Sequence, residues 1–348
     1  MIHNPITDFN WLPPANWQKI ETVDLHTGGE PLRVFTGELP EIKGETILAK
    51  RKFFKENLDY IRTGTMWEPR GHADMYGAVI TEPVNEGSDF GTFFLHNEGY
   101  STMCGHAIIA LVKLMHDSGI LVKSAEDPEY RIDAPPGLIR ARAELKDGKV
   151  VRTIFQNVPS FVLMADQKIV VPGIGEVKFD VAFGGAFYAF VEANSIGIGL
   201  EPKDFNQLID WGMKIKRAVS EKYHIQHPYD DDLSFLYGTI FKGKPKNKDN
   251  HSRNVCIFAE GEVDRSATGS GVSARAAIHA LKDDLNVGKK ITIESILDTT
   301  MTVKVVEETT FGPYKAVVPE VSGTAHFTGK NQFWFDPEDP LKNGFIFR

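Results

Sequence analysis

The stretch that most constrains the fold is residues 93–118, where a strand pattern turns into a helix pattern within a few positions. An apolar run reaches a turn at Gly99, and residues spaced for one face of a helix follow Gly105. Cys104 therefore falls at a strand-to-helix junction. The unpaired N–H groups and the positive dipole end of a helix start are expected to lower the pKa of a thiol below about 8.5 and to attract a carboxylate.

A second stretch repeats this order of elements. Residues 254–258 have a strand pattern, 264–271 a polar turn pattern and 272–285 a helix pattern. With the two helix starts aligned, Thr268-Gly269-Ser270 corresponds to Cys104-Gly105-His106. Each unit presents a thiol or a hydroxyl followed by glycine at a helix start, and the pair is expected to hold one small carboxylate between them.

The remaining sequence predicts a protein of the α+β or α/β class with two halves. The helix after Cys104 and the helix after Thr268 are each expected at the centre of one half, wrapped by mostly antiparallel strands. Asp147-Gly148 is a hairpin turn signal between two stretches of alternating pattern. Further strands are predicted at 20–25, 32–36, 73–81, 89–97, 130–145, 149–156, 181–191, 290–296 and 301–306, and further helices at 44–61 and 203–222.

Length, charge and cysteine content limit the binding partners and the cellular compartment that this protein is expected to have. The length of 348 residues suggests two domains at about 150 residues each. A net charge of -8 argues against nucleic acid and against an anionic membrane as the main partner. Two cysteines make no disulfide framework, which favours a cytoplasmic protein, and no signal peptide or apolar run of about 18 residues is visible. Cys256, in an apolar strand, is interpreted as an inert core residue.

No cofactor or metal is predicted. Gly28-Gly29 and Gly184-Gly185 lack the spacing of a dinucleotide-binding fingerprint. No lysine stands in a recognisable pyridoxal phosphate context. His72 and Asp74 have no third ligand in their pattern, so we interpret them as structural residues rather than as a metal pair. The chemistry would then be done by side chains alone.

Four motifs, in order along the chain, resemble the proline racemase family. They read DLHTGGEP at 24–31, EPRGH at 68–72, MCGH at 103–106 and DRS at 264–266, and the similarity spans nearly the whole chain. Racemases and hydroxyproline epimerases of this family carry a second cysteine in the last motif region, where this chain has Thr268. That departure resembles the trans-3-hydroxy-L-proline dehydratase branch.

The resemblance implies a fold like that of diaminopimelate epimerase, with the active site in the cleft between two halves. The first half would comprise residues 1–155 and 323–348 and carry Cys104. The second would comprise residues 156–322 and carry Asp264 and Thr268. The crossover of the terminal stretch back to the first half rests on this resemblance alone.

The resemblance also implies roles for individual residues. Cys104 and Thr268 stand at the two catalytic positions, and Asp264 is expected to face the ring nitrogen of the substrate. The other implied substrate-binding residues are Gly105, His106, Gly269 and Ser270. The implied ligand is a small amino acid, without cofactor or metal. Family members are often homodimers, but no feature of this sequence fixes the oligomeric state.

Three functions remain open from the sequence. The first is a lyase in which Cys104 removes the Cα proton of trans-3-hydroxy-L-proline and the 3-hydroxyl departs as water, giving Δ1-pyrroline-2-carboxylate. The second is a proline racemase or 4-hydroxyproline 2-epimerase, which needs an acid on the opposite face of Cα that Thr268 cannot readily supply. The third is a non-catalytic amino-acid-binding protein, which needs no thiol.

Overall fold

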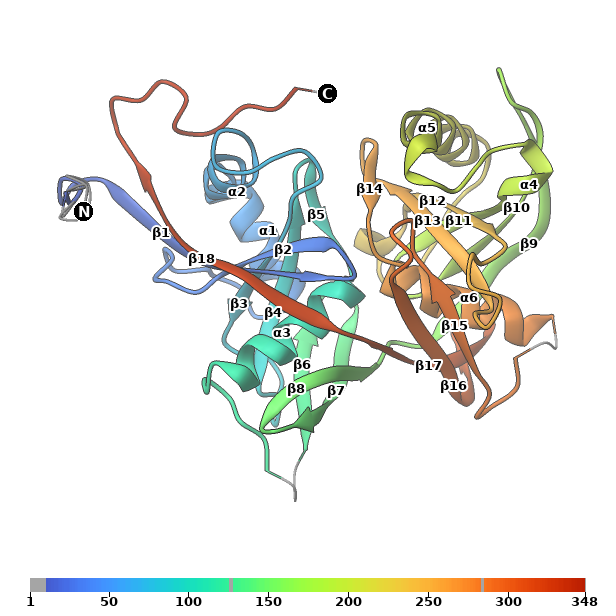
Figure 1. Cartoon of the computed structure of the whole chain (residues 1–348), viewed down its shortest axis with the longest axis horizontal. Coiled ribbons are helices and arrows are strands. Elements are labelled where there is room, and N and C mark those ends of the chain that lie inside the picture. Colours follow the sequence, from blue (N-terminus) through green and yellow to red (C-terminus); the bar gives the residue numbers. More distant parts are fainter. Residues whose placement is uncertain (1–10, 125–127, 283–284, 348) are drawn as a thin grey trace, which may run out of the picture.

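The computed structural model describes residues 11–124, 128–282 and 285–347. Two strand-rich units lie side by side, each built around one buried helix, α3 (Gly105–Asp117) in the first and α6 (Gly269–Leu281) in the second (Figure 1). Both helices are apolar on nearly every face, which is the composition of a helix that is buried all round. None of the helices in the described ranges is long and apolar enough to span a membrane.

The first unit surrounds α3 with strands and carries two helices on its outer side. Its elements are β1 (Gln18–Thr27), β2 (Glu30–Phe35), α1 (Ile47–Asn57), α2 (Asp59–Met66), β3 (Tyr76–Thr81), β4 (Phe90–His96), β5 (Gly99–Ser101), β6 (Glu129–Ala134), β7 (Gly137–Lys146), β8 (Lys149–Gln156) and β18 (Ala325–Phe335). The last of these, β18, pairs antiparallel with β1 along the whole of both strands, and Figure 1 shows it in red crossing the first unit.

The second unit surrounds α6 in the same manner. Its elements are β9 (Ser160–Val171), β10 (Gly175–Phe183), β11 (Phe187–Glu192), α4 (Ala193–Ile196), a 3-10 turn (Pro202–Asp204), α5 (Phe205–Lys222), a 3-10 turn (Asp231–Leu233), β12 (Leu236–Gly243), β13 (Ser252–Phe258), β14 (Glu262–Asp264), β15 (Lys290–Glu294), β16 (Thr300–Phe311) and β17 (Tyr314–Gly323). Because β17 pairs with both β8 and β9, the strands of the two units are joined at this end.

The two units repeat one pattern of strand pairing. In the first unit, β2 runs parallel to β3 and β4 runs parallel to β6, whereas β4 is antiparallel to β3 and β5. In the second, β11 is parallel to β12 and β13 is parallel to β15, whereas β13 is antiparallel to β12 and β14. The buried helix follows β5 in one unit and β14 in the other. The predicted fold of two pseudo-symmetric halves, each with a central helix, is confirmed.

The division of the chain into residues 1–155 with 323–348 and residues 156–322 stays a prediction. The pairing of β18 with β1 supports it, because this pairing attaches residues after 323 to the first unit.

Several predicted boundaries are wrong, each for a local reason. The single surface helix at 44–61 is two helices, because Leu58 leaves the helical region with φ -129 and ψ 12, and Phe54 of the first helix is fully buried. The single strand at 181–191 is β10 and β11, separated by a turn in which Gly185 has φ +100. The helix at 272–285 begins earlier, at Gly269, and residues 283–284 lie outside the described part.

Candidate active site

The thiol of Cys104 caps the start of α3. The residue has an extended backbone, with φ -143 and ψ 103, and its sulfur accepts a hydrogen bond from the Ala107 N–H at 3.3 Å. This is the position that serine or threonine takes when its side chain caps a helix. Thr27, from the first motif, donates its hydroxyl to the His106 carbonyl at 2.9 Å and so fixes the hairpin of β1 and β2 against this helix start.

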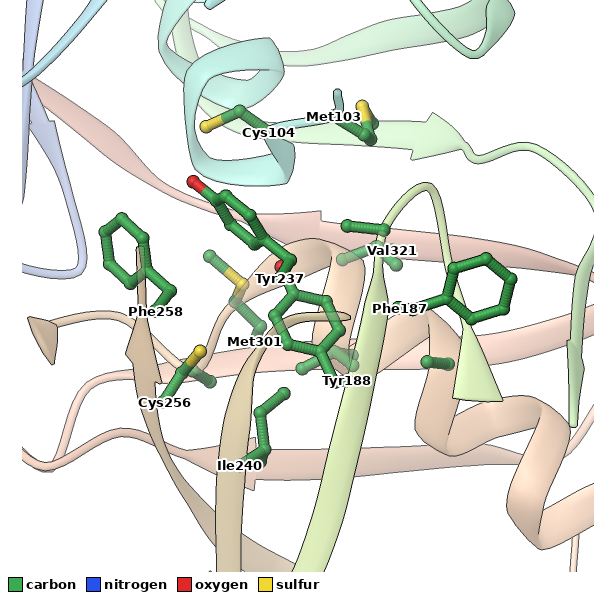
Figure 2. Packing of buried hydrophobic residues seen from close by; sticks show 14 of the residues in the cluster. Met103, Cys104, Phe187, Tyr188, Tyr237, Ile240, Cys256, Phe258, Met301 and Val321 are labelled. Atoms are coloured by element: carbon green, nitrogen blue, oxygen red, sulfur yellow. The ribbon is translucent and has the colours of Figure 1, made fainter. Parts of the chain in front are cut away.

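A small cavity of about 20 Å³ lies where the starts of α3 and α6 meet. Every site residue predicted from the sequence lines it, from Cys104, Gly105 and His106 on one side to Asp264, Thr268, Gly269 and Ser270 on the other. Six further lining residues were not predicted as site residues: Tyr76, Met103, Tyr188, Tyr237, Cys256 and Phe258. Figure 2 labels Met103, Tyr188, Tyr237, Cys256 and Phe258 together with Cys104.

The thiol of Cys104 and the imidazole of His106 form a buried pair. The sulfur is 3.2 Å from Nδ1 and 3.6 Å from Nε2, and the two residues are 3% and 4% exposed. Burial raises the pKa of the Cys104 thiol well above its ordinary value, and the negative charges of Asp264 and Glu30 raise it further. Burial lowers the pKa of His106. The resting pair is therefore a neutral thiol beside a neutral imidazole.

The expectation of a lowered thiol pKa at Cys104 is wrong for the resting site. The helix start acts in the predicted direction, since the Ala107 N–H lowers the pKa, but burial between the two units outweighs it. A local sequence pattern shows the helix start and does not show how deeply the second unit covers it.

Thr268 stands at the N-cap position of α6, without a capping hydrogen bond from its side chain and with an unusual backbone conformation. Its φ is +66 and its ψ is 94, a region in which a β-branched residue is strained. Its N–H donates to Ser266 Oγ at 3.1 Å. Its own hydroxyl oxygen is buried and near enough to the Cys256 thiol to lower that pKa, but no contact among the described residues gives it hydrogen-bond geometry. Strain and an unpaired polar atom at one position are features that cluster at functional sites.

Asp264 ends β14 directly beside the cavity. It is 5% exposed, and it lies opposite Cys256 in the pairing of β13 with β14. Its Oδ1 accepts the Ser266 N–H at 2.7 Å. Cys256 is fully buried, as its apolar strand predicts, but its side chain also lines the cavity.

Two carboxyl groups of the first unit hold the residue after Asp264. Glu30 Oε2 accepts the Arg265 N–H at 2.7 Å, and Asp74 Oδ2 is 2.6 Å from Arg265 Nη1. Burial raises the pKa of Glu30 well above its ordinary value, and the charge of Asp264 adds to this effect. Asp264 itself lines the cavity, and these contacts to the next residue hold it in place from the first unit.

His72 and Asp74 do not act together. His72 is exposed and its Nδ1 is 2.7 Å from the carbonyl of Ala73, whereas Asp74 is buried in the ion pair with Arg265. Across the residues that the structure describes, no group of three or more His, Cys, Asp or Glu side chains is placed to hold a metal ion.

The second helix start carries hydroxyl groups as well as N–H groups. Ser270 Oγ and the Tyr188 hydroxyl share a hydrogen bond of 2.7 Å, which orients the serine at the first turn of α6. The first N–H groups of a helix have no partner within the helix. Those of α3 and α6 converge on the cavity, which makes it suitable for a carboxylate.

Known proteins resemble this chain over nearly its whole length. The sequence model of the family described as Proline racemase matches residues 22–346. The chain is 50% identical over 341 residues to trans-3-hydroxy-L-proline dehydratase of Colwellia psychrerythraea, covering 97% of this chain and 96% of the relative. It is 45% identical over 325 residues to trans-3-hydroxy-L-proline dehydratase of Bacillus cereus, covering 93% and 97%.

A solved structure shares the fold across nearly the whole chain. It is a hydroxyproline epimerase from Agrobacterium vitis with bound trans-4-hydroxy-L-proline, and it superposes with a TM-score of 0.90 at 26% identity, covering 96% of each chain.

Proposed function

The chain belongs to the proline racemase family, and its activity is the dehydration of trans-3-hydroxy-L-proline, for which we propose that Cys104 is the base. Relatives with this activity match the chain at 45% and 50% identity over almost its full length. The observation that carries the assignment of roles is the asymmetry of the cavity, which has a thiol at the start of α3 and a threonine at the start of α6.

The substrate binds as a zwitterion. Its carboxylate takes the free N–H groups at the starts of α3 and α6, where Gly105, Gly269 and Ser270 line the cavity. Its ring ammonium group pairs with the carboxylate of Asp264 on the other side of the cavity. These two contacts fix Cα between Cys104 and Thr268.

Proton removal begins with the pair of Cys104 and His106. The imidazole, 3.2 Å from the sulfur, takes the thiol proton. The positive charge on the ring ammonium group of the substrate favours the thiolate that results. The thiolate removes the Cα proton. The electron pair left on Cα forms the C2=C3 double bond, and the C3–O bond breaks with its electrons on the hydroxyl group. The proton taken by Cys104 is returned to this leaving group, which departs as water.

The product of this step is the enamine Δ2-pyrroline-2-carboxylate, which tautomerises to Δ1-pyrroline-2-carboxylate. In the trans L-isomer the hydroxyl lies on the same ring face as the Cα hydrogen. Cys104 therefore meets both groups from one side, and Thr268 need not transfer a proton.

An isomerase is the second candidate, because the cavity contains another thiol. Cys256 lines it beside Thr268, but burial raises the pKa of Cys256 well above its ordinary value, as does the charge of Asp264. It lies within β13 and not at a helix start, so no backbone N–H group of a helix start favours its thiolate. We therefore place dehydration ahead of racemisation or 4-hydroxyproline epimerisation.

One experiment separates the three functions. The purified protein is incubated with the isomers of 3-hydroxyproline and of 4-hydroxyproline, and the pyrroline product and the configuration at Cα are measured. A dehydratase forms pyrroline from trans-3-hydroxy-L-proline. Interconversion of 4-hydroxyproline epimers without pyrroline would establish an isomerase, and binding without either change would establish a binding protein.

We also propose a cytoplasmic location and a homodimer. Cys104 and Cys256 are both free, which suits a reducing compartment. The homodimer follows from the family and is measured by light scattering on the purified protein.

A further inference from the structure

Three tyrosines line the cavity, and they differ in what their hydroxyl groups contact. The Tyr76 hydroxyl is hydrogen-bonded to Ser101 Oγ, and the Tyr188 hydroxyl to Ser270 Oγ at 2.7 Å. The Tyr237 hydroxyl is buried and has no hydrogen-bond partner within residues 11–124, 128–282 and 285–347. The Tyr76 hydroxyl lies near enough to lower the pKa of Tyr237 as a hydrogen-bonding neighbour does, but the contact between the two hydroxyl groups falls outside hydrogen-bond geometry.

Packing fixes the direction of the Tyr237 side chain. Its ring stacks on Phe258, with centroids 5.4 Å apart, and meets the rings of Tyr188 and His96 edge-on at 5.9 and 6.1 Å. The residue is 6% exposed, so the ring has no room to turn toward solvent. Figure 2 shows its hydroxyl pointing toward Cys104.

We propose that Tyr237 is a catalytic residue that binds the 3-hydroxyl group of the substrate and gives it the proton with which it leaves as water. This inference rests on the proposed dehydration by Cys104, and it changes one step: the proton taken by Cys104 reaches the leaving group through Tyr237 rather than directly. A buried hydroxyl without a partner is uncommon in folded proteins, because it has lost its contact with water and gained nothing in exchange. A hydroxyl on the ligand supplies the missing partner.

The stereochemistry selects Tyr237 over the other unpaired hydroxyl in the cavity. The 3-hydroxyl of the trans L-isomer lies on the face of the ring from which Cys104 takes the Cα proton. Tyr237 points toward Cys104, whereas Thr268 stands at the opposite helix start. Thr268 is therefore on the far side of Cα from the leaving group.

The protons and electrons balance over one turnover. The Cys104 thiolate gains the Cα proton, and the C3–O bond breaks with its electrons on oxygen. The Tyr237 phenol donates its proton to this oxygen, so water leaves and a phenolate remains. The Cys104 thiol, toward which Tyr237 points, then gives its proton to the phenolate. Tyr237 is again a phenol and Cys104 again a thiolate, and the thiolate recovers its own proton from His106 when the product leaves. Burial raises the pKa of Tyr237, so the phenol holds its proton until a base as strong as the departing hydroxide takes it.

The test is the variant Tyr237→Phe, which removes the hydroxyl group and keeps the ring. Among the described residues that hydroxyl has no hydrogen-bond partner, and the neighbouring Tyr76 hydroxyl keeps its bond to Ser101, so the fold is retained. We expect pyrroline formation from trans-3-hydroxy-L-proline to fall about 100-fold to 10,000-fold, the usual contribution of a general acid. Deuterium entry at Cα of L-proline, which has no leaving group, should stay within a few-fold of wild type.

A better leaving group gives the second readout. Fluoride is a far weaker base than hydroxide, so loss of fluoride from trans-3-fluoro-L-proline needs less help from an acid. In Tyr237→Phe, fluoride release should fall much less than water loss. The control is Tyr130→Phe, which removes another buried hydroxyl, bonded to His116 at 2.8 Å and away from the cavity, and should keep dehydration.

Two results would overturn the role of Tyr237. One is dehydration by Tyr237→Phe within tenfold of wild type. The other is an equal loss of water release, fluoride release and proline exchange, which would mean that the substitution harms Cys104 rather than the leaving group. Failure of the dehydratase assignment looks different, because wild-type protein would then form no pyrroline at all.

Discussion

The backbones of Gly105 and Gly269 are in direct contact at the starts of the two buried helices. A Cβ atom on Gly105 would be 2.6 Å from the Gly269 Cα, and a Cβ on Gly269 would be 2.7 Å from the Gly105 Cα. No side chain fits at either position without moving backbone. This contact sets the distance between Cys104 and Thr268, the residues that precede the two glycines. Each unit therefore contributes one helix start to the cavity, with Cys104 on one side and Thr268 on the other.

The first prediction concerns this contact. Gly269→Ala should push the starts of α3 and α6 apart and lower kcat/KM by on the order of 100-fold, since displacements of about 1 Å cost that much when reacting groups are misplaced. Gly119→Ala is a control for adding a methyl group, because nothing lies within 4 Å of a Cβ at that position, although its φ of +76 brings some strain. Full activity in Gly269→Ala would show that the helix spacing does not govern catalysis.

The second prediction tests the base. Cys104→Ala should abolish pyrroline formation and deuterium exchange at Cα, because no other described thiol lies beside an imidazole as Cys104 does. Cys256→Ala should retain measurable turnover. Iodoacetamide should inactivate wild-type protein, and substrate should protect it. Comparable loss of activity in both variants would remove the distinction between the two thiols.

The third prediction is stereochemical. The cis isomer of 3-hydroxy-L-proline carries its hydroxyl on the face opposite the Cα hydrogen, away from Cys104. It should be dehydrated at least about 100-fold more slowly than the trans isomer, since it loses the positioned acid. Initial rates of pyrroline formation from the two isomers measure this directly. Similar rates would contradict elimination from one face.

The fourth prediction restores a second acid–base group. Thr268→Cys places a thiol at the start of α6, opposite Cys104, and should interconvert the enantiomers of proline or the C2 epimers of 4-hydroxyproline, which wild type should not. The measurement is deuterium entry at Cα together with the appearance of the opposite configuration. If the folded variant binds these substrates but the configuration at Cα never changes, residue 268 does not face Cα.

The fifth prediction concerns stability at low pH. Glu294 accepts hydrogen bonds from the Asn250 side chain at 2.9 Å and from the N–H groups of Lys246 and Asn247, each at 2.8 Å, and it pairs with Arg253 at 2.9 Å. These partners outweigh the opposing effect of burial and lower the pKa of Glu294 to about 2. The carboxylate therefore stabilises the fold fully above its ordinary pKa of about 4.5, and the gain, of order 3 kcal/mol, is lost as pH falls toward 2.

Glu294→Gln should accordingly lower the free energy of unfolding at pH 7 and flatten its dependence on pH between about 5 and 2. Urea titrations over this range measure both effects. Glu308→Gln, on the exposed side of β16, is the control and should follow wild type. If Glu294→Gln keeps the wild-type pH dependence, another carboxyl group is responsible.

The sequence predicted the parts of the site that are local in the chain. Cys104 and Thr268 could be found because each lies at a junction of a strand or turn with a helix, and the junction itself is a pattern. The motifs also located Asp264, which packing then places beside the cavity.

The remaining site residues could not be predicted, because tertiary packing alone brings them together. Tyr76, Tyr188 and Tyr237 come from β3, β11 and β12, and alternation along a strand gives the face of a side chain but not what covers it. The raised pKa of Cys104 has the same origin, since it depends on burial by the other unit.

Because β18 pairs with β1, the part of the chain that is synthesised first is not the part that can complete its fold first. The strands β9 to β17 around α6 all lie between Ser160 and Gly323, whereas β1, although paired with β2 on one side, lacks its second neighbour until Phe335 has been made. Contacts between distant parts of a chain form slowly, and an unpaired strand edge invites pairing with other chains. A nascent chain that stalls before Ala325 therefore has a complete second unit and an open, aggregation-prone first one.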